Sequence, residues 1–171
     1  MKTYFIADTH FYHKNIIKYE NRPFESVEAM NWGIIKRWNG VVSKRDRVFL
    51  LGDFTFGNRE KQSEIAEKLN GYKILVKGNH DTYNDEFYRE IGFSEVYRYP
   101  ILFNGFWILS HEPVYMNENM PYANLYGHVH NNSAFKDYTN QTMCVSIERA
   151  HMNYSPIEFT RIKEIMGIGD K

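Results

Sequence analysis

Five stretches of the sequence end in side chains that bind metal ions or transfer protons. In each, a short run of apolar residues is followed by carboxylate, imidazole or amide groups. In chain order these groups are Asp8 and His10; Asp53; Asn79 and His80; His111; and His128 and His130. Mixed oxygen and nitrogen donors suit Mn, Fe, Co, Ni or Zn. The pattern predicts a metal site built from residues that lie far apart in the chain.

The distribution of the histidines supports this interpretation. Five of the seven histidines occupy these positions, although a single histidine is more often a structural or surface residue than a ligand. The donors outnumber the needs of one ion, whereas two ions about 3.5–4 Å apart with a shared carboxylate would use them all. Because Cys144 is the only cysteine, thiolate-rich zinc and iron–sulfur sites are excluded.

The elements that must position these groups alternate between strands and helices in the first half of the chain. Apolar, β-branched runs predict buried strands, and Gly78 lets the backbone turn sharply after one of them. Ser26 is a predicted helix N-cap, and Gly71 and Gly92 end later helices. The predicted strands are 4–7, 48–51 and 72–76, and the predicted helices are 27–39, 58–70 and 85–91.

The second half of the chain reads as strands and turns. Asn104-Gly105 predicts a hairpin between strands at 96–103 and 106–109. Further strands are expected at 124–126 and 143–147, and a terminal helix at 160–166. In open α/β sheets, ligands bind beyond the carboxyl ends of the strands, which is where the donor groups fall.

Size and composition favour one folded, soluble domain spanning 1–171. Hydrophobic residues make up 43% of the chain, and 21 Lys and Arg balance 21 Asp and Glu. The neutral net charge argues against long nucleic acids as the main partner. A single cysteine, an early carboxylate at Asp8 and the lack of a long apolar run lead us to expect a cytoplasmic protein without a membrane partner. The oligomeric state stays open.

The donor motifs resemble those of the calcineurin-like metallophosphoesterase superfamily. The resemblance is carried by Asp8-x-His10, Gly52-Asp53, Gly78-Asn79-His80-Asp81, Ser110-His111 and Gly127-His128-x-His130, in the order of that family. Ser110 departs from the glycine usual there. The run Asp8–Ile17 and the later Arg22-Pro23-Phe24 are similar to a compact bacterial and phage branch. The resemblance implies an α/β fold with four αββα layers, in which helices flank a β-sandwich of mixed sheets.

The same resemblance implies a role for each donor. Asp8, His10 and His130 would bind one divalent ion, and Asn79, His111 and His128 a second, with Asp53 bridging the two ions. Manganese is our first expectation for the metal, with Fe, Ni, Co or Zn as alternatives. His80 would not bind metal: it would act beside the substrate phosphate as an acid or charge stabiliser, held in place by Asp81.

These roles predict hydrolysis of a phosphate ester by a hydroxide held between the two ions. A phosphodiester is favoured slightly over a monoester, because His80 offers an acid for a poor leaving group. Small esters, nucleotides among them, fit the expected site. His13 and Arg22 are tentative substrate-binding residues, whereas the roles of Arg59 and His151 stay open. The alternative is a catalytically inactive scaffold of the same fold, although such relatives usually lose a donor.

Overall fold

Two β-sheets form the centre of the computed structural model, which describes residues 1–169. The larger sheet has the strand order β4-β3-β2-β1-β9. Strands β1 to β4 are parallel to one another, whereas β9 runs antiparallel to β1. The bounds of these strands are β1 (Thr3–Ile6), β2 (Arg47–Leu50), β3 (Tyr72–Val76), β4 (Phe93–Tyr97) and β9 (Ile157–Glu158).

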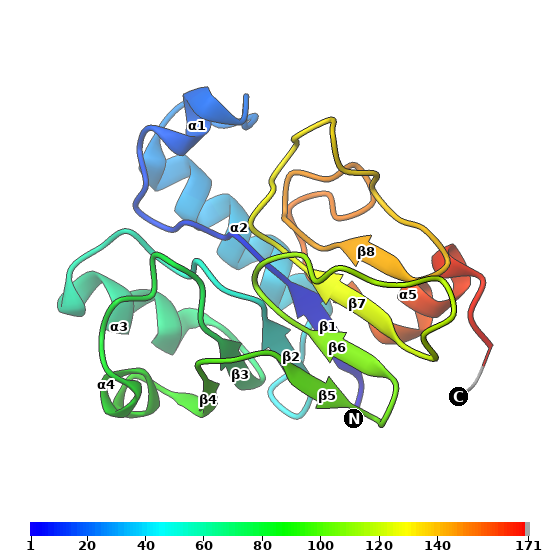
Figure 1. Cartoon of the computed structure of the whole chain (residues 1–171). Helices are drawn as coiled ribbons and strands as arrows, with labels where there is room; N and C mark the ends of the chain where they lie inside the picture. The colour runs from blue at the N-terminus through cyan, green and yellow to red at the C-terminus, as the bar shows by residue number, and fades with distance from the viewer. Residues whose placement is uncertain (170–171) are drawn as a thin grey trace.

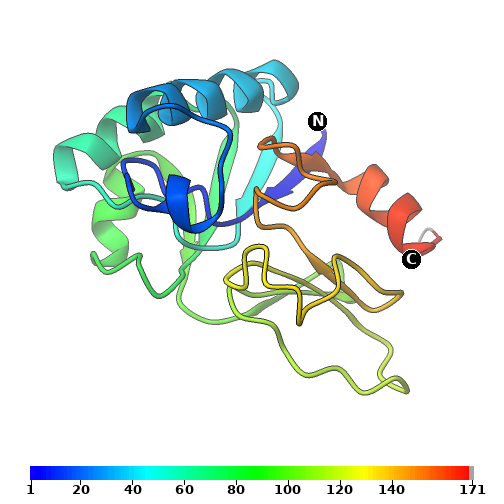
Figure 2. The same cartoon turned by 90° about the horizontal axis from the view of Figure 1, so that it is seen from above.

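The smaller sheet has the strand order β5-β6-β7-β8 and packs against the larger one (Figures 1 and 2). β5 and β6 form an antiparallel hairpin around Asn104 and Gly105, while β6, β7 and β8 are parallel. Their bounds are β5 (Ile101–Phe103), β6 (Trp107–Leu109), β7 (Ala123–Tyr126) and β8 (Thr142–Cys144). The first turn after each parallel strand therefore emerges on one side of the sandwich.

Helices cover the outer face of the larger sheet. In Figure 2, α2 and α3 lie on one side of this sheet and the smaller sheet lies on the other. Ser26 and Asn58 cap α2 and α3 by accepting a hydrogen bond from the backbone amide three residues later. The helix bounds are α1 (Ile16–Tyr19), α2 (Val27–Val41), α3 (Arg59–Lys68), α4 (Asp85–Glu90) and α5 (Phe159–Met166). Within residues 1–169, no helix is long and apolar enough to cross a membrane.

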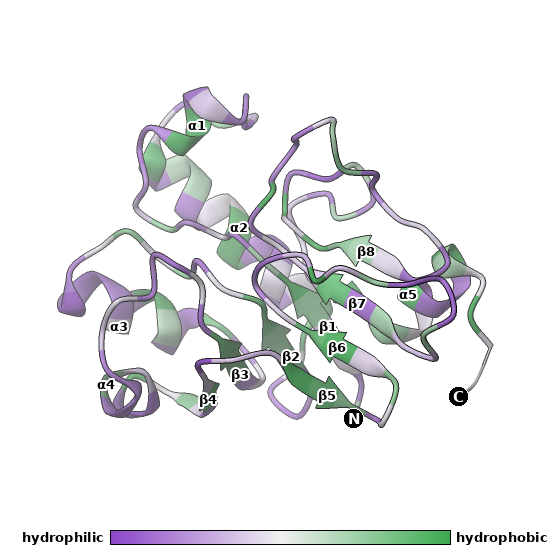
Figure 3. Cartoon of the chain, viewed as in Figure 1, coloured by the Kyte–Doolittle hydropathy of each residue, from purple (hydrophilic) through white to green (hydrophobic). Residues whose placement is uncertain are grey.

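Aromatic side chains fill the space between the two sheets. Phe5 of β1 stacks on Phe49 of β2 with ring centroids 5.2 Å apart, and both contact Phe103 of β5. Phe159, at the start of α5, contacts Trp107 of β6 as well as Phe5. The strands are accordingly among the most hydrophobic segments in Figure 3, while exposed helix faces are hydrophilic. This rigid core fixes the strand ends from which the polar groups project.

The predicted fold class, two mixed sheets flanked by helices, is confirmed, but two strand predictions were wrong in their extent. The predicted strand 96–103 is divided between β4 and β5, which belong to different sheets. The break includes Pro100, whose ring nitrogen has no hydrogen to donate to a ladder. The predicted strand 143–147 ends at Cys144, and Ser146 beyond it forms an isolated bridge to Ala7. The short β9 was not predicted.

Candidate metal centre

The carboxyl ends of five strands meet at one edge of the sandwich. Asp8 and His10 follow β1, Asp53 follows β2, and Asn79 follows β3 of the larger sheet, whereas His111 and His128 follow β6 and β7 of the smaller one. The two sheets are joined at this edge, because Ala7 pairs with Ser146 and its amide donates to Val145. The structure thus brings all seven expected metal ligands into one region.

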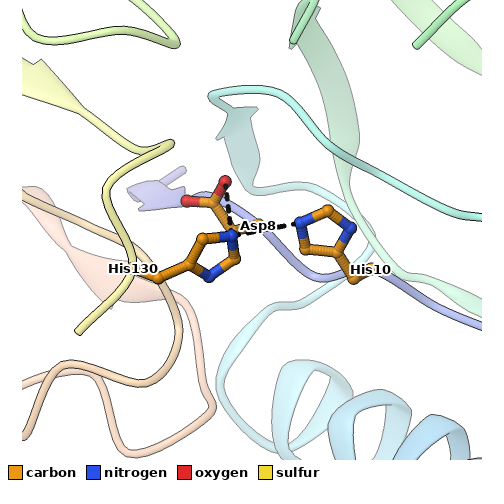
Figure 4. Close-up of side chains that lie close together, drawn as sticks. All are labelled: Asp8, His10 and His130. Carbon is orange, nitrogen blue, oxygen red and sulfur yellow. Dashed lines mark hydrogen bonds and ion pairs between the residues drawn. The ribbon is translucent and has the colours of Figure 1, made fainter. Parts of the chain in front are cut away.

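The first cluster consists of Asp8, His10 and His130 (Figure 4). His10 Nε2 and His130 Nε2 lie 3.3 Å apart, and His130 Nε2 is 4.0 Å from Asp8 Oδ1. Asp8 and His10 are almost fully buried, at 0% and 2% exposure. These three residues offer one carboxylate and two imidazole donors to a common point.

The second cluster consists of Asn79, His111 and His128. Asn79 Oδ1 lies 3.0 Å from His111 Nε2 and 3.1 Å from His128 Nδ1, and the two imidazole nitrogens are themselves 3.1 Å apart. His111 Nδ1 donates to the backbone carbonyl of Leu51 at 2.9 Å, so that Nε2 presents its lone pair to the cluster. Three donor atoms again converge on one point.

Asp53 lies between the two clusters. Its Oδ2 atom is 3.4 Å from His10 Nε2 and 3.5 Å from His111 Nε2. Ligand atoms bound to one ion at about 2.0–2.2 Å lie roughly 3–3.5 Å from one another. The nitrogen–nitrogen and nitrogen–oxygen separations in the second cluster, between His10 and His130 and around Asp53 match that spacing, and the 4.0 Å from His130 Nε2 to Asp8 Oδ1 is slightly longer, so the donor set fits divalent metal ions of the kind that the sequence predicts.

Five of these residues hold the backbone in the left-handed region, which is unfavourable for residues other than glycine. The φ angles are 58° at Asp8, 46° at His10, 56° at Asp53, 67° at His128 and 46° at His130. Each such residue costs on the order of 1–3 kcal/mol and persists only where the surroundings enforce it. Strain is therefore concentrated where the donors converge.

The glycines that precede the donors allow the loops to approach one another. A Cβ atom on Gly78 would lie under 3.0 Å from Asp53, and one on Gly127 would lie under 3.0 Å from Asp8. A Cβ atom on Gly52 would collide with the ring of His111. The glycine–donor pairs in the sequence thus have a steric cause: each glycine leaves the room that a donor from another loop fills.

Burial and neighbouring charges set the protonation of the first cluster. Burial raises the pKa of Asp8 to about 6, whereas burial and the neighbouring His130 lower the pKa of His10 strongly. Burial alone would lower the pKa of His130, but its hydrogen bond to Glu148 and the charge of Asp8 raise it to about 9. Without metal, these opposite shifts place a proton on His130 and leave His10 neutral.

Asp81 does not hold His80 in place, contrary to the expectation from the family. Its carboxylate accepts hydrogen bonds from the backbone amides of Gly78, Asp53 and Phe54, at 2.8, 2.8 and 3.0 Å. Within residues 1–169, no hydrogen bond joins its side chain to His80. Burial raises its pKa to about 6. Asp81 instead fastens the loop after β3 to the loop after β2.

The two tentative substrate-binding residues lie in different surroundings. The ring of His13 lies 5.4 Å from that of His10 and 4.2 Å from the exposed ring of Phe56, at the rim of the first cluster. The Arg22 side chain is 0% exposed and pairs with Glu148. Arg22 is therefore neither a phosphate-binding group at the surface nor a surface loop anchor, because its guanidinium is used inside the protein.

The two residues whose roles stayed open make structural contacts. The Arg59 guanidinium lies over the rings of Tyr83 and Phe87, at 5.1 and 4.8 Å from the ring centroids. His151 is half-buried, and its Nε2 atom hydrogen-bonds the backbone carbonyl of Cys144 at 2.8 Å. Neither side chain belongs to the donor clusters.

Two buried polar residues beside the first cluster were not identified from the sequence. Ser146 donates to Asp8 Oδ2 at 2.6 Å, and Glu148 Oε1 lies 3.2 Å from His130 Nδ1. Glu148 directly follows the predicted strand 143–147, whereas Ser146 lies within it. The position rule that found the donors could therefore have found Glu148 but not Ser146.

A cavity of about 980 Å³ opens beside His128 and His130. It is bordered by the donors His128 and His130 and by the carboxylates of Glu20 and Glu112, and no lysine or arginine of the described residues 1–169 lines it. Its remaining walls are aromatic or amide side chains together with Pro113 and Val129. A small molecule bound there would reach the donor clusters directly.

The family of the chain follows from its similarity to known proteins. The family model of calcineurin-like phosphoesterases matches residues 1–149. An uncharacterized protein of Methanocaldococcus jannaschii, MJ1445, is 36% identical over 98% of this chain and 93% of its own length. The crystal structure of AQ665 from Aquifex aeolicus, a protein of unknown function, covers 96% of this chain and 98% of its own with a TM-score of 0.71 and 31% identity.

A shorter match links the chain to a named enzyme. The glycerophosphodiester phosphodiesterase GpdQ of Enterobacter lignolyticus is 31% identical over 44% of this chain and 28% of its own length. Fold and donor set define a metal-dependent phosphoesterase architecture. The chain belongs to the calcineurin-like phosphoesterase family.

Proposed function

We propose that the protein hydrolyses a small phosphodiester with two divalent metal ions, one in each donor cluster. Asp8, His10 and His130 would hold one ion, and Asn79, His111 and His128 the other. The observation that carries the proposal is the position of Asp53, whose Oδ2 atom lies 3.4 and 3.5 Å from one nitrogen of each cluster. A carboxylate oxygen at equal distance from two donor sets suits a shared ligand.

When bound, such ions lower the pKa of a water molecule between them to about 7 and offset the charge of a phosphate. The mixed carboxylate, imidazole and amide donors support Mn, with Fe, Co, Ni or Zn as alternatives. The protein supplies the geometry of the donors. Asp81 contributes by tying the loops of Asp53 and Asn79 together through backbone amides.

His80 is the group in position to move a proton. Its ring is exposed and lies 5.5 Å from the ring of His10, and its backbone amide donates to Asp53 Oδ1 at 3.0 Å. The backbone is thus anchored to the centre while the imidazole remains accessible to a ligand. A protonated His80 would stabilise charge on the phosphate or donate to the leaving oxygen.

The charge of the cavity favours a diester over more highly charged esters. A phosphodiester carries one negative charge, whereas monoesters and polyphosphates carry more. Glu20 and Glu112 at the cavity would repel that additional charge, and among residues 1–169 no lysine or arginine lines the cavity to compensate. The partial similarity to a glycerophosphodiester phosphodiesterase supports the same preference.

The test is a hydrolysis assay of the chelator-treated protein after addition of Mn²⁺, Co²⁺, Ni²⁺, Fe²⁺ or Zn²⁺. We expect metal-dependent cleavage of bis-p-nitrophenyl phosphate with a higher kcat/KM than that of p-nitrophenyl phosphate. The variant Asp53→Asn should remove the activity, because it weakens the ligand shared by both clusters. The surface variant Glu67→Gln on α3 serves as the control and should retain it.

Two outcomes would contradict the proposal. Faster cleavage of the monoester would overturn the diester preference alone. Inactivity with every metal, in protein shown by elemental analysis to have bound metal, would favour the catalytically inactive scaffold.

A further inference from the structure

The segment after β8 carries two buried polar side chains that the proposed reaction does not use. Ser146 is 0% exposed, and the side chain of Glu148 is also 0% exposed. The segment runs beside the end of β1, because the Ala7 amide donates to Val145 and the Ile147 amide donates back to Ala7. Ser146 and Glu148 therefore lie next to the loop that carries Asp8 and His10.

Ser146 fixes the carboxylate of Asp8. Its hydroxyl donates to Asp8 Oδ2 at 2.6 Å, and the backbone amide of His128 lies 2.9 Å from the same oxygen and 3.1 Å from Oδ1. Two donors from different segments thus hold one carboxylate. Rotation of the Asp8 side chain away from the first cluster would break both sets of hydrogen bonds.

Glu148 fixes the imidazole of His130. A carboxylate accepts hydrogen bonds only, so the hydrogen between Glu148 Oε1 and His130 Nδ1, 3.2 Å apart, belongs to the imidazole. In the neutral ring that binds a metal ion, Nδ1 would carry this hydrogen and the lone pair would be on Nε2, which lies 3.3 Å from His10 Nε2. A carboxylate behind a ligating imidazole orients the ring and raises its basicity as a ligand.

Arg22 holds Glu148 in place and also holds the backbone of the first cluster. Its Nε atom donates to Glu148 Oε1 at 2.8 Å, and its Nη2 atom pairs with the same oxygen. The remaining donors reach the carbonyls of Thr9 and Asp8 at 2.9 and 2.7 Å. One buried guanidinium therefore offsets the charge of Glu148 and ties it to the loop after β1.

The second cluster has no comparable side-chain support. His111 Nδ1 hydrogen-bonds a backbone carbonyl, that of Leu51, at 2.9 Å. In the part of the chain that the structure describes, no carboxylate hydrogen-bonds the imidazoles of His111 or His128. The two clusters therefore differ in a property that single substitutions can remove from one and not from the other.

We infer that Ser146, Glu148 and Arg22 are positioning residues that set the metal affinity of the Asp8–His10–His130 cluster without binding metal themselves. The inference rests on the proposed pair of metal ions. It makes the two clusters unequal: loss of Glu148 weakens one binding event and spares the other. Since Glu148 is not a ligand, its removal leaves all proposed donors in the chain.

The test is a calorimetric titration of the metal-free wild-type protein and of metal-free Glu148→Gln with Mn²⁺. Elemental analysis after dialysis then measures how much metal each protein retains. Glutamine keeps the size of the side chain and removes its charge. We expect the wild-type protein to bind two equivalents, and the variant to bind one of them unchanged and the other 10–100-fold more weakly, roughly the range typical for such outer partners of a ligand. The Mn²⁺ electron paramagnetic resonance spectrum should change from that of a coupled pair to that of an isolated ion.

Two further variants make the test robust. Ser146→Ala removes a single hydroxyl and acts on Asp8 instead of His130. It should weaken the same binding event, and it keeps the inference testable should Glu148→Gln fail to fold. Glu67→Gln removes a carboxylate from the exposed face of α3 and should bind both equivalents as the wild-type protein does.

Each contrary result has a distinct meaning. Unchanged affinities for both equivalents in Glu148→Gln and Ser146→Ala, or an equal loss of both, would overturn the inference and leave the proposed function intact. Fewer than two equivalents in the wild-type protein would overturn the pair of ions on which both proposals rest.

Discussion

The imidazole of His80 differs from the donor histidines of the centre because its ring lies beside the first cluster, 5.5 Å from the ring of His10, without a hydrogen bond to any donor among residues 1–169. It is exposed, and within residues 1–169 its ring makes no hydrogen bond, while its ring centroid lies 5.3 Å from that of Phe56. Only its backbone is tied to the centre, through Asp53. A group with this combination of fixed backbone and free ring is suited to proton transfer.

Replacing His80 by alanine should separate catalysis from metal binding. We expect kcat to fall by about 10²–10⁴-fold, the usual contribution of a general acid, while the metal content stays at the wild-type value. Steady-state kinetics and elemental analysis of the same sample measure both quantities. The neighbouring variant Asn79→Ala is the matched comparison and should lose metal. Equal metal loss in His80→Ala would instead make His80 a ligand.

At the residue scale, the donors were predictable from sequence, whereas the contacts that support them were not. Each proposed ligand follows a strand, so a local pattern reveals it. The role of Asp81 depends on backbone amides of a loop 27 or 28 positions away, and the burial of Arg22 depends on a carboxylate 126 positions away. Spacing along the chain contains no information on such partners.

At the scale of the elements, a single carboxylate fastens the start of β2 to the start of β1. Asp46 Oδ1 accepts from the backbone amide of Lys2 at 2.7 Å, and Oδ2 accepts from the amide and hydroxyl of Ser43 at 2.9 and 2.7 Å. These hydrogen bonds, the one from Lys2 first, lower the pKa of Asp46 to about 2. The ionised form is therefore the one that the folded state favours.

The variant Asp46→Asn should lower the free energy of unfolding by about 1 kcal/mol at pH 7. Because the folded-state pKa lies below the ordinary value of 3.8, this stability is present above pH 3.8 and is lost as the pH falls toward 2. Urea unfolding of both metal-free proteins at pH 7, 5 and 3 measures the difference. This difference should become smaller as the pH falls from 7 to 3. The exposed variant Glu90→Gln should unfold as the wild-type protein does at each pH.

The elements themselves were predictable where their signals are local. The N-caps Ser26 and Asn58 and the turn at Asn104-Gly105 each act on adjacent residues, and the structure has a helix or hairpin at each. The division of 96–103 between two sheets and the two-residue β9 depend on which strands are neighbours in space. Local propensity does not specify that choice, so these features could not be predicted.

At the scale of the whole molecule, the donor clusters connect the two sheets. The donors come from β1, β2 and β3 on one side and from β6 and β7 on the other, over positions 8 to 130. The unfolded chain cannot present them together. Metal binding should therefore stabilise the folded protein by mass action.

Saturating Mn²⁺ should raise the Tm of the metal-free protein by roughly 5–10 °C for each of the two bound ions. At about 100 times Kd, one bound ion adds about 2.7 kcal/mol, and a chain of this size gains about 2–4 °C for each kcal/mol. Differential scanning fluorimetry with and without EDTA measures the shift. Asp53→Asn should show a smaller one, and an equal shift in both proteins would mean that the ions bind elsewhere.

The cavity described above is bordered by carboxylates, and no lysine or arginine in the described part of the chain lines it. In the proposed enzyme, most of the attraction for an anionic ester would then come from the ions, with His80 as the contribution of the polypeptide. By thermodynamic reciprocity, an ester that binds more tightly when the ions are present must in turn raise the affinity of the protein for the ions. At low cellular metal, the ester itself would help to keep the enzyme loaded.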